Sequence, residues 1–344
     1  MKELLKRLSL AFGPSGCEDS VRAMIEKEIE PYIKNAEVIK DGVGNLIVHF
    51  NSEGKPRLMV SAHMDEVGFM VTGITQNGLL KFGAVGGFDP IVLSAKRVIS
   101  ESGVKGNIIS KPIHLLTKEE SEGAPKISNM SIDIGADSKK EAEALTFIGD
   151  YFTFDSDFVE YGEDLLKCKA LDDRLGCAIM CQLIKDVSES KSEIPFDLYF
   201  SFSCKEEVGY SGAFGASAQI KPDYAIVIES KAVSDIFGVP DEKKVCTLGD
   251  GVIISFADKG AIYDRDLVRH IMRLCDENKI KYQTNKFISG GNDSANIQKN
   301  ASGCRVSVLS AASRYIHSPA DVISYSDFLT IYEASRAVIF TEIK

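Results

Sequence analysis

Apolar positions near the start of the chain follow first a helical and then a strand-like period. They recur at helical spacing over residues 4–10 and 21–29, and a turn of glycine, proline and serine at 13–16 separates the two stretches. Nearly continuous apolar runs then occupy residues 45–50 and 57–62. This pattern predicts two amphipathic helices followed by two buried strands.

From about residue 67 to about residue 164 the pattern changes to short β-like runs between clusters of glycine, asparagine, serine and lysine. These runs lie at residues 68–74, 98–100, 106–110 and 152–154. One short acidic helix is predicted at 138–145, and the polar stretch 112–129 is predicted to be an exposed loop. We therefore expect residues 67–164 to form a small β-rich domain inserted into a larger one.

After residue 167 helical and strand-like segments alternate. Helices are predicted at 172–187, 211–219, 266–278 and 326–341, and strands at 196–203, 224–228, 281–287 and 305–309. Apolar strands between helices are typical of a sheet that is covered on both faces. The expected fold is a three-layer α/β/α sandwich with a mixed, mostly parallel sheet, built from residues 1–66 and 165–344.

The composition is that of an ordinary globular protein, and it narrows the function classes. Of 344 residues, 44% are hydrophobic and 26% are charged, and 40 basic against 50 acidic residues give a net charge of −10. This balance leaves no large basic surface, so nucleic acids and anionic membranes are not expected as partners. The length exceeds what one hydrophobic core usually supports, which favours two domains.

Targeting and redox features of the sequence favour the cytoplasm. No apolar run reaches the roughly 20 residues that a membrane span needs, and the amphipathic first helix is not expected to be a signal peptide. Eight cysteines are scattered without a C-x-x-C pair, which predicts reduced thiols, most of them in the core. We therefore expect a cytoplasmic protein.

Histidines and acids of the sheet region lie just after its predicted strands or at the start of a helix. They are His63, Asp65, Asp172, Glu206, Glu207, Glu229 and His317. Most of them alone have an ordinary explanation, such as a helix N-cap for Asp172. Glu229 is harder to explain in this way, because a buried strand seldom ends in an unpaired acid. Because sites in open α/β sheets gather at the carboxyl ends of the strands, however, we expect these side chains to meet at one edge.

Two imidazoles and several carboxylates at one edge indicate a two-metal hydrolase. Nitrogen and oxygen ligands suit zinc, cobalt or manganese, and two ions need a bridging carboxylate. The set divides evenly if Asp172 bridges, with His63 and Glu229 on one ion and Glu207 and His317 on the other. Glu206 then remains as the general base that takes a proton from the attacking water. Asp65 is placed to accept the other ring N–H of His63 and fix its tautomer.

At these residues the chain resembles the tetrahedral, or glutamyl (deblocking), aminopeptidases, a family of metallopeptidases with two co-catalytic ions. The resemblance rests on motifs spread over nearly the whole chain: Gly13-Pro14-Ser15-Gly16, Ala62-His63-Met64-Asp65-Glu66, Lys169-Ala170-Leu171-Asp172-Asp173, Glu206-Glu207-Val208-Gly209 and Arg314-Tyr315-Ile316-His317-Ser318. It implies a zinc-peptidase-like fold, the same ligand assignment, and two divalent ions, of zinc or cobalt, or else manganese. It also implies a PDZ-like insert that mediates dimerisation, and dimers that assemble into a hollow tetrahedral dodecamer acting on peptides.

The sequence departs from the family pattern in two places. Where the family usually has Asp-Val-Thr, this chain has Glu229-Ser230-Lys231. The usual Gly-Gly-Thr-Asp-Ala-Gly loop is replaced by residues 290–295, with the sequence Gly-Gly-Asn-Asp-Ser-Ala. Because both segments belong to the expected site, the identity of the preferred N-terminal residue does not follow from the resemblance.

Four functions compete at the level of sequence. The leading hypothesis is a metal-dependent aminopeptidase acting on unblocked peptides. The alternative with the same site is an N-acyl amino acid or peptide deacylase, which Glu229 and the altered loop motivate. A glycoside hydrolase would use Glu206 and Glu207 as its acid pair but needs no histidines. A non-enzymatic assembly protein would bind peptides by strand addition to the insert and leaves the acids at the strand ends unexplained.

Overall fold

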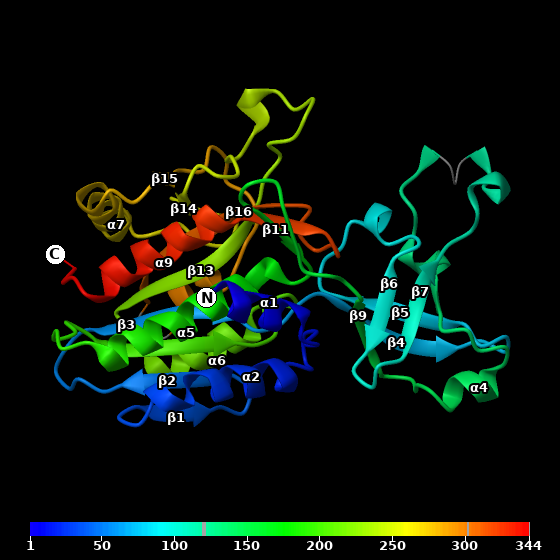
Figure 1. The fold of residues 1–344 in the computed structure, drawn as a ribbon, viewed down its shortest axis with the longest axis horizontal. Coiled ribbons are helices and arrows are strands. Elements are labelled where there is room, and N and C mark those ends of the chain that lie inside the picture. Colours follow the sequence, from blue (N-terminus) through cyan, green and yellow to red (C-terminus); the bar gives the residue numbers. More distant parts are fainter. Residues whose placement is uncertain (119–121, 301–302, 344) are drawn as a thin grey trace.

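The computed structural model describes residues 1–118, 122–300 and 303–343. In Figure 1 the chain forms a large sheet with its helices and, beside it, a smaller group of strands that close into a barrel. The chain enters the barrel after the third strand and returns to the sheet before the longest helix. Both chain termini lie on the side of the large sheet (Figure 1).

The large sheet has eleven strands drawn from both halves of the chain. They are β1 (Glu37–Lys40), β2 (Leu46–Phe50), β3 (Arg57–His63), β10 (Val159–Tyr161), β11 (Leu165–Cys168), β12 (Asp197–Ser203), β13 (Tyr224–Ala232), β14 (Val252–Ile254), β15 (Tyr282–Gln283), β16 (Arg305–Arg314) and β17 (Asp321–Ser324). Their order is β1-β2-β12-β3-β13-β16-β17-β11-β10, with β14 and β15 attached to β16.

The sheet is mixed, as expected, but parallel pairing is concentrated at its centre. Strands β12, β3, β13 and β16 pair parallel, whereas the strands outside them pair antiparallel, except that β14 and β15 pair parallel with each other. The prediction of a mostly parallel sheet was therefore too broad. Strands β3, β12 and β16 are buried along nearly their whole length and β13 from Ala225 to Glu229, which explains their continuous apolar sequences.

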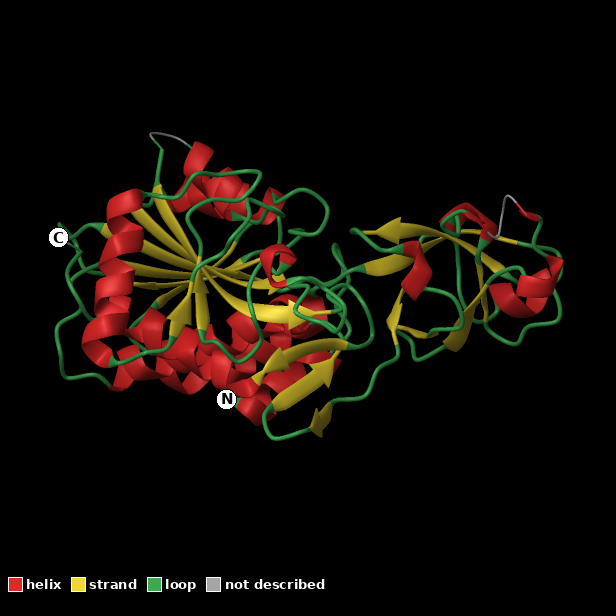
Figure 2. Ribbon diagram, turned by 90° about the horizontal axis from the view of Figure 1, so that it is seen from above, coloured by secondary structure: helices red, strands yellow, loops and turns green. Residues whose placement is uncertain are grey.

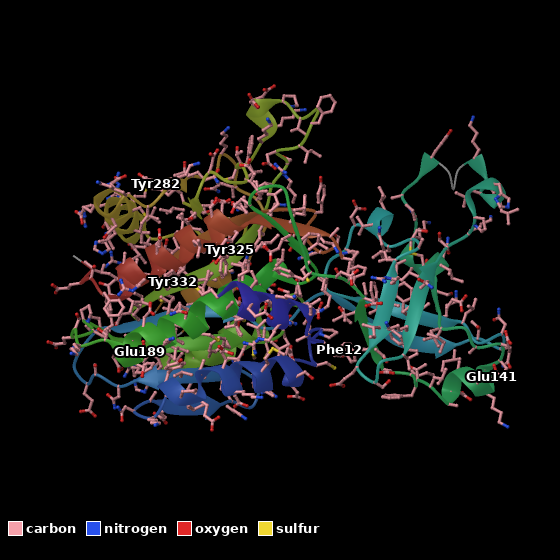
Figure 3. The ribbon with its side chains drawn as sticks, viewed as in Figure 1. Phe12, Glu141, Glu189, Tyr282, Tyr325 and Tyr332 are labelled. Atoms are coloured by element: carbon pink, nitrogen blue, oxygen red, sulfur yellow. The ribbon has the colours of Figure 1, made fainter. Side chains whose placement is uncertain are left out.

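Helices cover both faces of the large sheet (Figure 2). The helices of this region are α1 (Lys2–Leu10), α2 (Asp19–Ile29), α5 (Leu171–Glu189), α6 (Ser211–Ile220), α7 (Arg265–Asn278), α8 (Ser294–Lys299) and α9 (Tyr325–Ile339), with short 3-10 helices at Glu30–Tyr32 and Asp241–Lys243. Helices α5 and α9 pack together, and the Tyr332 hydroxyl, labelled in Figure 3, donates a 2.6 Å hydrogen bond to Asp186 of α5. Helices α6 and α8 pack against each other and against the central strands.

The barrel closes in the order β4-β5-β8-β7-β6-β9. Its elements are β4 (Gly68–Ile74), β5 (Leu80–Val85), β6 (Arg97–Ser100), β7 (Lys105–Ile109), β8 (Ser131–Asp133), α4 (Lys139–Glu143) and β9 (Tyr151–Phe154), with 3-10 turns at Pro90–Val92, Ile113–Leu115 and Ile127–Asn129. Its core is aromatic: Phe69 stacks on Phe88 at 4.9 Å and meets Phe82 and Phe154 edge-on. The PDZ-like architecture that the resemblance implies stays a prediction.

Several elements differ from the sequence prediction at their ends. The strand expected at 224–228 continues to Ala232, and the one expected at 305–309 continues to Arg314, because the two pair with each other over their full length. The strand expected at 281–287 is reduced to β15, which pairs only with the three-residue β14. The expected loop at 112–129 is largely exposed where it is described, and its residues 119–121 lie outside the described part.

A buried ionic network joins the barrel to the sheet. The Glu66 carboxylate, just after β3, lies 2.7 Å from the Lys169 ammonium and accepts a 2.7 Å hydrogen bond from the Thr153 hydroxyl of β9. Arg174 of α5 lies 3.5 Å from the same carboxylate. Glu66, Lys169 and Arg174 are at most 3% exposed, so the network holds together the segments that enter and leave the barrel.

Two further predictions bear on compartment and chemistry. All eight cysteines are unpaired, and six of them are buried, in line with the reduced thiols expected from the sequence. Within the described residues, none of the helices is both long and apolar enough to pass through a lipid bilayer.

Candidate metal centre

The first half of the site joins the end of one strand, the start of a helix and the middle of another strand. His63 ends β3, Asp172 lies at the start of α5, and Glu229 lies within β13. The Nε2 atom of His63 is 3.4 Å from Asp172 Oδ1 and 3.8 Å from Glu229 Oε1. All three residues are buried, and their ligand atoms lie within 4.8 Å of one another, so these side chains meet as the sequence predicted.

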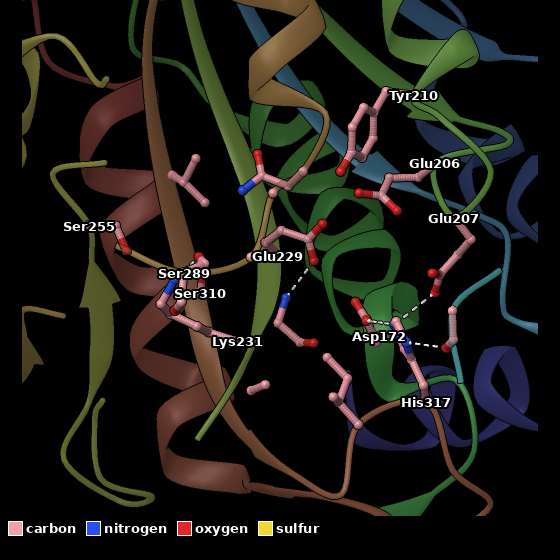
Figure 4. A pocket seen from close by; sticks show the side chains of 18 of the residues that line it. Asp172, Glu206, Glu207, Tyr210, Glu229, Lys231, Ser255, Ser289, Ser310 and His317 are labelled. Carbon is pink, nitrogen blue, oxygen red and sulfur yellow. Dashed lines mark hydrogen bonds and ion pairs between the residues drawn. The ribbon is translucent and has the colours of Figure 1, made fainter. Parts of the chain in front are cut away.

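The second half lies on the other side of Asp172. His317, in the loop between β16 and β17, places Nε2 3.3 Å from Asp172 Oδ2 and 3.2 Å from Glu207 Oε1. Glu207 follows β12, and its neighbour Glu206 joins it and His63 in a third close group. Asp172 therefore presents one oxygen to each histidine, as a bridging carboxylate must. Figure 4 shows Asp172 beside His317.

Asp172 and Asp173 have non-helical backbone angles, with ψ of 108° and 42°, at the very start of α5. The regular helix therefore begins only after them, and their side chains are not confined to the helix surface. Asp173 is fully buried and accepts hydrogen bonds from the backbone N–H groups of His63 and Gly176. It thereby ties the end of β3 to the start of α5.

Both histidines are oriented by backbone carbonyls. His63 Nδ1 lies 3.0 Å from the carbonyl oxygen of Asp65, and His317 Nδ1 lies 2.7 Å from that of Gly87. A carbonyl only accepts, so each Nδ1 carries a proton, and each Nε2 is the ring nitrogen that faces the carboxylates. Gly87 lies in the loop after β5, and therefore the barrel contributes to the site through its backbone.

Asp65 holds the two glutamates more directly than it holds His63. Its carboxylate lies 3.5 Å from His63 Nδ1, whereas it accepts hydrogen bonds from the backbone N–H of Glu206 at 3.0 Å and of Glu207 at 3.2 Å. The Ser15 hydroxyl donates a third bond at 2.6 Å. The expected contact with His63 is thus made mainly by the Asp65 backbone, and the Asp65 side chain fixes the segment that carries Glu206 and Glu207.

Burial and mutual charge shift the pKa values of the cluster. Burial acts to lower the pKa of His63, yet the neighbouring carboxylates of Asp172 and Asp65 outweigh it and hold that pKa well above its usual value. Burial raises the pKa of Glu206 and of Glu229 well above the usual carboxyl range, and neighbouring carboxylates add to the increase. The acids of the cluster outnumber its two imidazoles, so a bound cation would relieve their repulsion.

The donor atoms fit divalent metal ions. Two ligand atoms held tetrahedrally at about 2.0–2.1 Å from one zinc ion lie about 3.3 Å apart. The imidazole–carboxylate distances of 3.2–3.8 Å are close to that separation. Asp172 Oδ1 and Glu207 Oε1 are buried and accept no hydrogen bond from the described residues, so each keeps a lone pair free for a cation.

The cluster forms one wall of a pocket of about 480 Å³ (Figure 4). Glu206, Glu207 and His317 lie on one side of the close-up, whereas Lys231, Ser289 and Ser310 lie on the opposite side, with Glu229 between them. The sequence singled out Lys231 and residues 290–295 only as departures from a family pattern. The contact of Gly87 with His317 had no sequence signal, because it uses a carbonyl oxygen that every residue carries.

Comparison with known proteins agrees with this geometry. The profile of the M42 glutamyl aminopeptidase family matches residues 44–333. The TET aminopeptidase from a marine sediment thaumarchaeon superposes with a TM-score of 0.94 at 32% identity, over 98% of this chain and 95% of that one. The Pyrococcus horikoshii TET1 peptidase, described as assembling into a tetrahedron or a large octahedral shell, has a TM-score of 0.86 at 32% identity and 99% coverage of both chains.

One similar structure carries a different name. A Thermotoga maritima protein described as an endoglucanase is 32% identical, with a TM-score of 0.79 over 97% of this chain and 96% of its own.

The family match and the two-histidine cluster together define a metallopeptidase. The chain belongs to the M42 glutamyl aminopeptidase family, and it is an enzyme that acts on peptide bonds.

Proposed function

We propose that the protein is an aminopeptidase that removes N-terminal residues from unblocked peptides with the help of two divalent metal ions. The observation that carries the proposal is the carboxylate of Asp172, whose two oxygens face two different histidines. His63 and Glu229 would complete one ion's ligands, and His317 and Glu207 the other's. Zinc or cobalt suits these nitrogen and oxygen donors, and manganese is the next choice.

When bound, the ions supply Lewis acidity that polarises the scissile carbonyl and lowers the pKa of a water molecule. Glu206 contributes the proton chemistry. Its carboxylate accepts a proton from the attacking water and returns it to the leaving nitrogen. Burial raises the pKa of Glu206, which makes its carboxylate a stronger base than an exposed one. Asp65 keeps Glu206 in position through the bond from the Glu206 backbone N–H.

The alternatives from the sequence fare less well. The family match gives no support to the deacylase. A glycoside hydrolase needs a carboxylate pair without imidazoles, whereas here Glu206 and Glu207 form one group with His63. Although the Thermotoga maritima structure is described as an endoglucanase, the histidines of the cluster favour a metallopeptidase over a glycoside hydrolase.

We further propose that residues 67–164 are a domain inserted between 1–66 and 165–344, and that it mediates self-association. Phe147 and Ile148, next to the barrel strands, are each 65% exposed, and Leu145 is 49% exposed. An apolar group of this kind is typical of a contact surface. The Pyrococcus horikoshii relative is described as assembling into a tetrahedron or a large octahedral shell. We therefore propose a dimer, and a dodecamer built from dimers, as the states to look for by light scattering.

The test is hydrolysis of free dipeptides and aminoacyl-anilides beside their N-acetylated twins, with added Co²⁺ or Zn²⁺. We expect release only from free amines, loss of turnover on chelation, and recovery when metal is restored. Release only from the acetylated twins would make the enzyme a deacylase. Absence of turnover on both sets, in a protein that binds the metals, would refute the proposed activity.

A further inference from the structure

The end of the pocket opposite the metal cluster carries a single cationic side chain. Among the described residues that line the pocket, Lys231 is the sole lysine or arginine. The lining includes the hydroxyl-bearing residues Ser255, Ser289 and Ser310 and the apolar residues Ala232, Val308 and Ile316. A cation beside hydroxyl groups in such a pocket can orient a charged or polar group of a ligand.

The Lys231 ammonium lacks a carboxylate partner. Its one hydrogen bond among the described residues is a long one, 3.4 Å to the carbonyl oxygen of Ser289, and it forms no ion pair with any of them. The side chain is only partly exposed. An ammonium group has three donors, so a partly buried one with a single long bond is left with donors to satisfy.

The strand fixes the place of this charge relative to the metal cluster. Glu229 and Lys231 are two residues apart on β13, so their side chains leave the same face of the strand, with α-carbons about 6.6 Å apart. β13 pairs with β16 in register at both positions, opposite Ser310 and Ala312, which keeps the spacing rigid. The distance between a ligand group bound at Lys231 and the candidate metal ligand Glu229 is therefore about the length of one amino-acid residue.

We infer that Lys231 is a specificity-determining residue that binds a carboxylate of the substrate. This inference rests on the proposed aminopeptidase activity. A substrate carboxylate that reaches the end of the pocket with Lys231 meets a cation there, and this attraction favours substrates that carry such a group. Two sources supply such a group at this distance: an acidic side chain on the N-terminal residue, or the C-terminal carboxylate of a very short peptide.

The first experiment compares substrates that differ only in charge. We expect kcat/KM to be higher for glutamyl- than for glutaminyl-p-nitroanilide. Lys231→Met should reduce this preference roughly 10- to 100-fold, the range for a charge-assisted hydrogen bond, whereas Lys231→Arg should keep most of it. Lys259→Met, which changes an exposed lysine outside the pocket lining, is the matched control and should keep the glutamyl preference.

A second arm separates the two carboxylate sources. It compares the dipeptide Gln-Gly with its C-terminal amide in the same variants. An effect of Lys231→Met on the anilide pair assigns the carboxylate to the side chain, and an effect confined to the dipeptide pair assigns it to the C-terminus. Either result supports the inference. An unchanged preference in both pairs overturns it.

A binding measurement distinguishes failure of this inference from failure of the proposed function. If no substrate is hydrolysed, the proposed activity fails, but calorimetric titration with L-glutamate and L-glutamine still tests Lys231. Tighter binding of glutamate, lost in Lys231→Met and kept in Lys231→Arg, supports the inference. Equal binding of the two amino acids by the unmodified protein, together with equal binding of Gln-Gly and its C-terminal amide, overturns it.

Discussion

The large sheet and the barrel contribute to the candidate site in different ways. The sheet and its connecting loops provide every side chain of the cluster, from His63 on β3 to His317 after β16. The barrel side contributes a backbone group: the carbonyl oxygen of Gly87 accepts a 2.7 Å hydrogen bond from His317. The sheet thus supplies chemistry, which depends on residue type, while the barrel supplies position, which depends on backbone.

The largest effect should follow from removing the side chain that both halves of the centre share. We expect Asp172→Ala to abolish peptidase activity and to lose nearly all bound metal, because both histidines face this carboxylate. Metal content after dialysis, measured by mass spectrometry, tests this beside the hydrolysis assay. Asp137→Ala, at an exposed acid of the barrel region, should retain both properties. Full metal content in Asp172→Ala would show that this carboxylate is not a bridge.

Two adjacent glutamates should then separate catalysis from metal binding. Glu206→Gln should reduce kcat by roughly 10²–10⁴-fold, the usual contribution of a general base, and keep the metal content. Glu207→Gln should reduce the metal content, because its carboxylate faces His317 at 3.2 Å. Should Glu206→Gln keep more than about a tenth of the activity, another group must be the base.

The contrast between these neighbours shows what the sequence can predict about the site. Strand ends predicted that His63, Glu207 and Glu229 converge, since apolar runs locate buried strands and parallel strands share an edge. The backbone contact of Gly87 was not predictable, because it depends on how the barrel packs against the sheet. The role of Lys231 was missed because β13 was expected to end at residue 228, whereas pairing with β16 extends it to Ala232.

The same reasoning applies to the fold. Alternating helices and strands predicted the layers, and the change of texture near residue 67 predicted a β-rich segment. Strands β5 and β8 were not predicted, because β5 contains Lys81 and Gly83 and β8 has only three residues. Such short strands form because the closed barrel provides partners on both edges, which is a property of tertiary structure.

The junction between the two regions should be the next most sensitive place, and there the effect is on stability. Lys169→Met leaves the buried Glu66 carboxylate without its closest cation, and we expect the free energy of unfolding to fall by about 3–5 kcal/mol. Urea denaturation measures this. Lys2→Met, which breaks the exposed pair with Glu160, should have a far smaller effect, because solvent screens an exposed pair. Equal effects of the two substitutions would contradict a structural role for the buried pair.

The smallest effect tests whether the barrel positions the site. A Cβ added at Gly86 would lie 2.7 Å from Val67 Cγ1 and 3.3 Å from Glu207 Cβ, and the residue has a φ of +90°. Gly103 has nearly the same φ, +89°, with nothing within 4 Å of such a Cβ. Each change to alanine should cost about 1–2 kcal/mol of stability. Only Gly86→Ala should also reduce kcat/KM, by roughly 10-fold, through displacement of Glu207.

The two glycines therefore form a matched pair. Thermal denaturation reports the shared backbone cost, and the kinetic assay reports the displacement at the site. If both variants lose activity equally, the loss of activity results from backbone strain in the barrel and not from the contact between residue 86 and Glu207.

The bond between the Gly87 carbonyl and His317 has a thermodynamic consequence. Because one end belongs to the barrel and the other to the cluster, the free energy of holding the barrel in place and the affinity for a cation at His317 share one term. Linkage is reciprocal: whatever fixes the barrel tightens cation binding, and the cation in turn fixes the barrel by the same factor. An assembly that holds the barrel in place would then also raise the metal occupancy. Dilution, which dissociates such an assembly, and chelation, which removes the metal, would each increase the effect of the other.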